Sequence, residues 1–175
     1  MKIESKEDLF VAWLSEIYSA EKQVADILPK IIEEATNPEL KDMLRAHLRE
    51  TEKQVVRLDE IFKILNCEIE DKKCDGMKGL VLEANSLILR VKDRTVLDSA
   101  LIAVTQKIER YEIFCYETLC TLGEALNHEG ALMLLRRTLV EEKAADEKLH
   151  AITFGLSAWG VAPPRHGYEG SEIPL

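Results

Sequence analysis

Side chains that commonly bind metal ions stand where a helix normally carries core residues. Four segments place apolar residues three or four positions apart, which is typical of helices with one buried face. Seven carboxylate or imidazole side chains interrupt those faces near their middles: Glu21, His47, Glu50, Glu109, Glu112, Glu142 and Asp146. Oxygen-rich ligation with a single imidazole suits iron or manganese better than copper, with zinc as an alternative. The pattern predicts a metal site inside a helical bundle.

The positions of these side chains follow from the helical period of about 100° per residue. Glu21 lies on the apolar face of the first segment, His47 near the centre of the second face, and Glu50 at its edge. The third segment places Glu112 within its apolar face and Glu109 on the flank of that face. In the fourth segment the apolar repeat is interrupted by two acids, and it runs Leu132, Leu135, Leu139, Glu142, Asp146, Leu149 and Thr153.

A single acid on an apolar face is weak support for a site, because helix ends, drift of the pattern and long side chains that reach solvent explain most cases. Seven such residues are harder to explain in this way, because burying a carboxylate without a partner lowers the stability of the folded state. Lys22 and Lys143 adjoin these positions but lie beside the buried faces. Two divalent ions would leave the six carboxylates with a formal charge of about -2, and two trivalent ions would leave about zero. The charges therefore favour two bound ions.

The elements that must position these residues are predicted from breakers and caps. Ser5 and Asp8 begin the first helix, Pro29 lies inside it, and Asn37 followed by Pro38 begins the second. We expect long helices over 5–35, 38–65, 96–126 and 130–154, a polar loop over 66–79 and a short helix over 80–91. Residues 1–156 would form one helical domain, and 157–175, which contain Pro163 and Pro164, an extended C-terminal tail.

Composition excludes several classes of protein. The 175 residues include 32 acidic and 23 basic side chains, a net charge of -9, whereas nucleic-acid binding needs a basic face. No apolar run approaches the roughly 18 residues of a membrane span, and the start lacks a signal-peptide core, so we expect a cytoplasmic protein. The four cysteines form no Cys-x-x-Cys pair, which argues against zinc-ribbon and rubredoxin sites. Cys115 and Cys120 are expected in the core, and Cys67 and Cys74 in the loop.

Four motifs carry a resemblance to a known family. They read EIYSAEKQ at 16–23, HLRETEKQ at 47–54, QKIERYEI at 106–113 and EEKAADEKL at 141–149. In order and spacing they resemble the ferritin-like superfamily and, more narrowly, the YciE/YciF-type stress-protein family. The resemblance covers about residues 5–154. It implies an all-α, ferritin-like four-helix bundle with an extra short helix and one long crossover over 66–95.

The resemblance also implies a dinuclear metal centre, a homodimer and a role in stress. Glu21 would be the ligand from the first helix, Glu50 a bridging acid with His47 one turn before it, and Glu109 with Glu112 the third-helix pair. Glu142 would bridge from the fourth helix. The sequence departs from the common pattern twice: the second helix has His47-x-x-Glu50 instead of Glu-x-x-His, and Asp146 replaces a histidine, with His150 ranked below it.

Several functions remain open from the sequence. The first is an oxidoreductase acting on dioxygen or a peroxide, with two iron ions preferred and manganese as the alternative. Without a rubredoxin-type donor, such an enzyme would need an external reductant. The others are a non-catalytic, metal-stabilised structural or stress protein, an iron-binding store, and a metal-free interaction bundle. The sequence does not assign catalytic residues.

Overall fold

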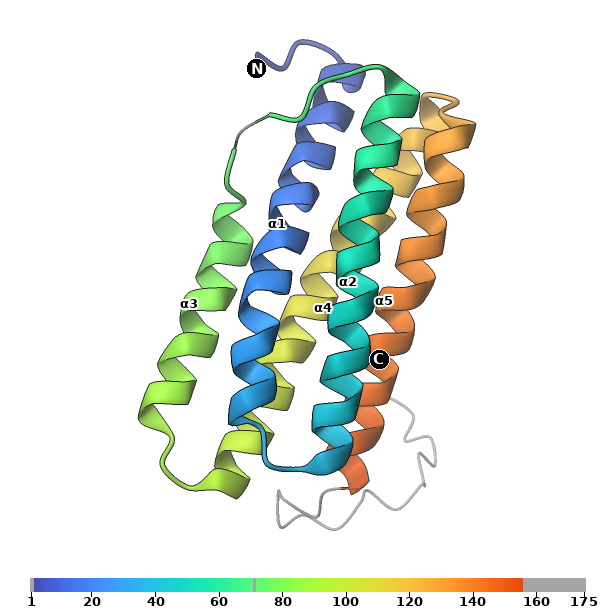
Figure 1. Cartoon of the computed structure of the whole chain (residues 1–175). Coiled ribbons are helices and arrows are strands. Elements are labelled where there is room, and N and C mark those ends of the chain that lie inside the picture. The colour runs from blue at the N-terminus through green and yellow to red at the C-terminus, as the bar shows by residue number, and fades with distance from the viewer. Residues whose placement is uncertain (1, 71, 156–175) are drawn as a thin grey trace, which may run out of the picture.

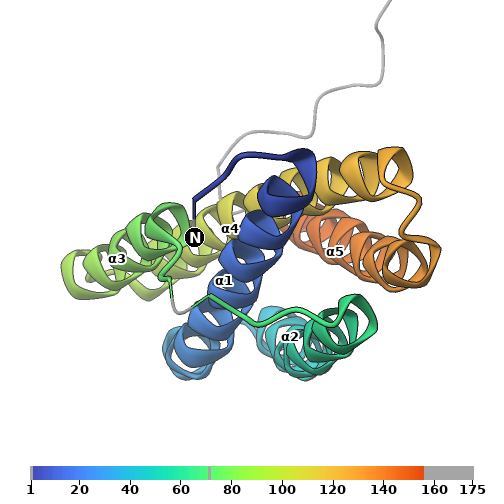
Figure 2. The same ribbon diagram turned by 90° about the horizontal axis from the view of Figure 1, so that it is seen from above.

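The described part of the chain is a bundle of long helices. The computed structural model describes residues 2–70 and 72–155. Within them lie five α-helices: α1 (Lys6–Glu34), α2 (Pro38–Leu65), α3 (Asp75–Arg90), α4 (Arg94–Ala125) and α5 (Glu129–Gly155). Helices α1, α2, α4 and α5 form the bundle, and α3 packs outside it against α1 and α4 (Figures 1 and 2). The predicted all-α four-helix bundle with an extra short helix is confirmed; the predicted tail lies outside the described residues.

The connections agree with the predicted topology. A short turn joins α1 to α2, and another joins α4 to α5, so each pair is antiparallel (Figure 1). Between α2 and α4 the chain travels the length of the bundle through a loop and α3. This is the long crossover expected over residues 66–95. It leaves α2 and α5 as neighbours, in contact along the bundle.

The helix starts follow the sequence signals. The Ser5 hydroxyl accepts a hydrogen bond from the Asp8 amide at 3.0 Å, and Asn37 Oδ1 accepts one from the Leu40 amide at 3.0 Å. Pro38 then occupies the first turn of α2, where a missing amide hydrogen costs nothing. Helix α1 continues through Pro29 to Glu34, as expected.

The start of α3 corrects the prediction of a loop over 66–79. The helix begins at Asp75, five residues before the expected position, because the Cys74 thiol caps it by accepting a hydrogen bond from the Met77 amide at 3.4 Å. Gly76 lies against the Tyr111 ring, where a Cβ would approach ring atoms to 2.9 Å. Cys74 is therefore a buried cap, not a loop residue. A thiol is not among the usual capping side chains, so the start of α3 could not be predicted from Cys74.

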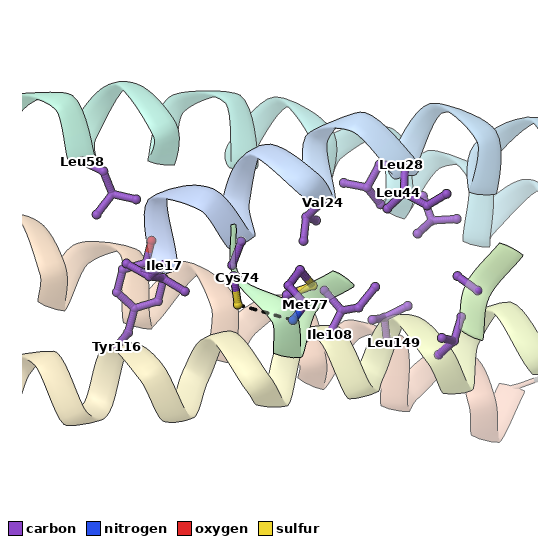
Figure 3. Close-up of a cluster of buried hydrophobic side chains, with 14 of the residues drawn as sticks. Ile17, Val24, Leu28, Leu44, Leu58, Cys74, Met77, Ile108, Tyr116 and Leu149 are labelled. Carbon is purple, nitrogen blue, oxygen red and sulfur yellow. Dashed lines mark hydrogen bonds between the residues drawn. The ribbon is translucent and has the colours of Figure 1, made fainter. Parts of the chain in front are cut away.

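Two apolar layers enclose the middle of the bundle. Figure 3 shows Ile17, Leu58 and Tyr116 together at one end of the buried cluster and Leu28, Leu44 and Leu149 at the other. Along α1, Glu21 lies between the two layers, and along α2 so does His47. Glu21 and His47 thus belong to a polar layer that has hydrocarbon on both sides along the bundle.

Asp98, near the start of α4, forms hydrogen bonds with the turn between α1 and α2. Its carboxylate accepts hydrogen bonds from the Thr36 amide at 2.7 Å, the Asn37 amide at 2.9 Å and the Thr36 hydroxyl. Asp98 is 3% exposed, so its carboxylate depends on these donors to offset the cost of its burial. One side chain therefore fixes three of the four bundle helices relative to one another.

We predict that Asp98→Ala lowers the free energy of unfolding by about 2–4 kcal/mol, because it removes three hydrogen bonds to a charged acceptor that join the turn to α4. The measurement is urea unfolding followed by circular dichroism. Asp42→Ala is the matched control, since Asp42 is exposed and pairs with the exposed Arg45, and it should change stability by less than about 0.5 kcal/mol. Equal effects of the two variants would contradict the role given to Asp98.

Candidate metal centre

Three helices bring four of the predicted ligands together. His47 on α2, Glu109 and Glu112 on α4, and Glu142 on α5 each offer a ligand atom, and these atoms all lie within 4.8 Å of one another. Their exposed fractions are 2%, 0%, 1% and 0%. We call these four residues the central group. Glu109 and Glu112 share a face because they are three positions apart on a helix.

The central group has almost no hydrogen bonds. His47 Nε2 lies 2.9 Å from Glu109 Oε1, but the contact is not aligned as a hydrogen bond. Within the described residues, neither ring nitrogen of His47 has a hydrogen-bond partner, nor does any carboxylate oxygen of Glu109, Glu112 or Glu142. Buried polar atoms without partners are rare in folded proteins. Carboxylate oxygens and one imidazole converging on a point are the donor set of a hard or borderline divalent cation, so the central group fits a metal ion.

Burial and crowding of like charges control the protonation of the central group. Burial raises the pKa of Glu112 well above its ordinary range, and the nearby Glu21 and Glu109 carboxylates raise it further. The pKa of Glu142 is raised well above its ordinary range for the same reasons. Burial lowers the pKa of His47, but the Glu109, Glu21 and Glu50 carboxylates together outweigh it, and the net shift is upward. Without a cation, Glu112, Glu142 and His47 therefore bind protons more tightly than the same groups do in water.

Glu21 is buried beside the central group but outside the set of atoms within 4.8 Å. It is fully enclosed, and the Tyr116 hydroxyl donates a hydrogen bond to its Oε1 at 2.5 Å, while Oε2 has no partner among the described residues. Burial raises the pKa of Glu21 to about 7, and the Tyr116 bond partly opposes that rise. The charges of His47 and Glu109 also act on the pKa of Glu21, in opposite directions, which indicates that Glu21 lies near the group. Its free oxygen can therefore serve a second ion.

The two remaining predicted ligands lie further out. Glu50 is half-buried and lines a surface pocket together with His47. Asp146 is half-buried between α4 and α5, where it accepts a hydrogen bond from Gln106 Nε2 at 3.3 Å and lies 3.5 Å from Arg110 Nε. Four residues advance a helix by about 6 Å along its axis, so Asp146 lies about one turn beyond Glu142, where it contacts Gln106 and Arg110. The structure does not bring Asp146 into the central group.

A buried polar network next to the site was missed by the sequence reasoning. Arg57 is 6% exposed and forms two hydrogen bonds to Glu141, at 2.9 and 3.0 Å, besides one to Thr138 at 2.5 Å. Gln54 Nε2 donates to the same Glu141 carboxylate at 3.3 Å. Gln54 and Arg57 are three positions apart on the buried side of α2, and this spacing could have indicated the network. Because both side chains are polar, they were not considered as buried residues.

Comparison with known proteins identifies relatives over most of the chain. Residues 5–157 match the family model "Domain of unknown function (DUF892)". Protein YciF of Escherichia coli is 44% identical over 150 residues, which cover 85% of this chain and 90% of YciF. The crystal structure of that stress protein superposes with a TM-score of 0.85, at 41% identity over 90% of this chain and 99% of its own. YcfI from Rhodopseudomonas palustris, proposed as a structural protein, has a TM-score of 0.83 at 43% identity, covering 85% of this chain and 95% of its own.

The predicted YciF-type resemblance is thereby confirmed. Among the described helices, none is long and apolar enough to cross a membrane. Neither the comparisons nor the fold assigns the predicted homodimer, which stays a prediction.

We predict that the metal-free protein becomes less stable as the pH rises from about 5.5 to about 8. In the folded state the pKa of Glu21 is about 7, against an ordinary value of 4.5, so the folded chain binds more protons than the unfolded chain between these values. The stability linked to this proton is fully present below the unfolded pKa and is lost as the pH rises through the folded one. Glu112 and Glu142 act in the same direction.

Chemical unfolding in the presence of a chelator measures this effect, and Glu21 alone should contribute on the order of 2 kcal/mol. Glu21→Gln should flatten the decline, because the amide does not ionise. A stability that rises steadily over this pH range would contradict the arrangement of charges described above.

Proposed function

The chain belongs to the DUF892 family of YciF-type proteins, and from that premise we propose that its bundle holds two divalent metal ions, iron or manganese. One observation carries the proposal: four ligand side chains from three helices converge within 4.8 Å, and their buried ligand atoms lack hydrogen-bond partners in the described structure. A bound cation supplies the compensation that those atoms lack. All four come from one chain, so the proposal does not depend on a dimer.

The number of ions follows from the charge of the buried layer. Glu21, Glu109, Glu112 and Glu142 are at most 1% exposed, and when ionised they carry a formal charge of about -4, which two divalent ions balance. We assign His47, Glu109, Glu112 and Glu142 as ligands. Glu21, through its free Oε2, and Glu50, beside His47, complete the two coordination shells.

The proposed activity is that of an oxidoreductase acting on dioxygen or a peroxide. A pair of iron or manganese ions supplies the capacity to bind and reduce such an oxidant. The Tyr116 hydroxyl fixes the orientation of Glu21 through their hydrogen bond. The apolar layers around Ile17 and Leu44 exclude bulk water from the site. The raised pKa of Glu112 and Glu142 means that cation binding releases protons from these two carboxyl groups.

A second candidate is a metal-stabilised stress protein without turnover. The observation in its favour is the depth of the central group, whose members are at most 2% exposed. A cation there would cross-link α2, α4 and α5 and stabilise the folded state in proportion to its affinity. Consumption of peroxide or dioxygen by the metal-loaded protein, with a supplied reductant, separates the two candidates: turnover supports the oxidoreductase, and stabilisation without turnover supports the stress protein.

We predict that the wild-type protein, loaded anaerobically with Fe²⁺ and desalted, retains two ions per chain by elemental analysis. Glu142→Gln should keep the fold but lose metal, with affinity falling by more than about 100-fold, because changes in outer-shell partners alone cost about 10- to 100-fold. Glu147→Gln, an exposed neighbour on α5, is the matched control and should bind like the wild type. Equal metal content in all three proteins would contradict the assignment.

A separate prediction concerns Asp146. Because Asp146 contacts Gln106 and Arg110 and lies outside the central group, Asp146→Asn should retain two ions per chain, whereas Glu109→Gln should not. Metal titration of both variants, with circular dichroism to confirm the fold, makes the comparison. Loss of metal in Asp146→Asn would restore Asp146 to the ligand set.

A further inference from the structure

A pocket of about 510 Å³ lies between α2 and α5 and reaches the candidate metal centre. We call it the α2–α5 pocket. Its lining includes Glu39, Asp42, Ala46, His47 and Glu50 from α2, and Lys148, Ala151 and Ile152 from α5. At 1.5 Å per residue, the α2 side extends about 16 Å from Glu39 in the first turn to Glu50. It therefore spans the distance from the bundle end to the buried layer.

His47 connects this pocket to the central group. It is 2% exposed, both of its ring nitrogens lack a hydrogen-bond partner in the described structure, and it belongs both to the pocket lining and to the central group. Three other pockets, of about 230, 420 and 330 Å³, contain no member of the central group. A buried metal site that exchanges its ion with solvent needs an opening to the surface. The α2–α5 pocket provides such an opening, because His47 of the central group forms part of its lining.

The charge of the α2–α5 pocket suits a cation. Glu39 and Asp42 are exposed near the bundle end, Glu50 is half-buried beside His47, and Lys148 is the opposing ammonium group. Asp42 is also paired with Arg45 at 2.9 Å, an exposed contact that is weak in water. The carboxylates of Glu39, Asp42 and Glu50 line the α2 side of the pocket, about one turn and then about two turns apart. Glu39 and Asp42 are exposed and Glu50 is half-buried, so exposure decreases toward the imidazole of His47.

We infer that the α2–α5 pocket is the route by which divalent cations reach the buried centre, with Glu39 and Asp42 collecting the ion and Glu50 passing it to His47. The inference rests on the proposed metal centre but concerns a different property, the rate of loading. Carboxylates along a concave path raise the local cation concentration and the association rate, and this effect weakens with salt. Because they do not touch the bound ion, Glu39 and Asp42 should leave the number of bound ions unchanged.

The test is stopped-flow mixing of metal-free, full-length protein with Co²⁺ at low ionic strength, followed by the visible absorption of the bound ion. Glu39→Gln combined with Asp42→Asn should slow loading by about 3- to 10-fold, with the same final absorbance. Raising the salt concentration should remove most of that difference. Lys148→Gln should accelerate loading.

The matched control combines Glu52→Gln with Glu60→Gln. Both residues are exposed on α2 and lie outside the pocket lining, so this variant loses the same two charges elsewhere. It should load at the wild-type rate. Ala151→Phe narrows the pocket without changing charge, and it should slow loading to an extent that salt does not alter.

The loading rates and the binding of Co²⁺ distinguish failure of the entry route from failure of the metal centre. Slower loading in the Glu39/Asp42 and Ala151 variants, with a normal control, supports the route. If the wild type binds Co²⁺ but the pocket variants load at its rate, the route is wrong and the metal centre stands. If the wild type binds no Co²⁺ at all, the metal centre fails and the route fails with it.

Discussion

Repulsion among carboxylates that have been removed from water is the constraint on which this molecule depends. Glu21, Glu109, Glu112 and Glu142 occupy one layer of the bundle with almost no contact with solvent. Each would be costly to bury alone, and burial together with neighbouring carboxylates raises the pKa of Glu21, Glu112 and Glu142. Such a layer is tolerated if it retains protons or binds cations. The proposed metal centre is the second of these solutions.

The rest of the fold holds that layer in place. Hydrocarbon from Ile17, Leu58 and Tyr116 closes one side, and Leu28, Leu44 and Leu149 close the other (Figure 3). Because the ligands come from separate helices, the bundle must be assembled before they meet. The stabilisation of the layer is therefore linked to the packing around it, and a cation bound there would stabilise the contacts between α2, α4 and α5.

The sequence predicted most of this arrangement because both fold and site are recorded in helical periodicity. Apolar faces and caps such as Asn37 defined the long helices, and Glu21, His47, Glu109, Glu112 and Glu142 were recognised as polar residues on those faces. Asp146 was predicted as a ligand because it continues the three-four repeat of the fourth helix, but in the structure it contacts Gln106 and Arg110. Residue spacing also could not reveal that Arg57 pairs with Glu141 across two helices, or that a thiol caps α3. Those features depend on tertiary contacts between distant segments.

The central claim is that the unpaired side chains of the central group are metal ligands. Anomalous diffraction from crystals of the full chain grown with Mn²⁺, collected on both sides of the metal absorption edge, tests it most directly. We expect two adjacent anomalous peaks, bounded by His47, Glu109, Glu112 and Glu142, with Glu21 turned toward one of them. A bundle interior without an anomalous peak, in which those carboxylates are bonded to one another through shared protons or to ordered water, would contradict it.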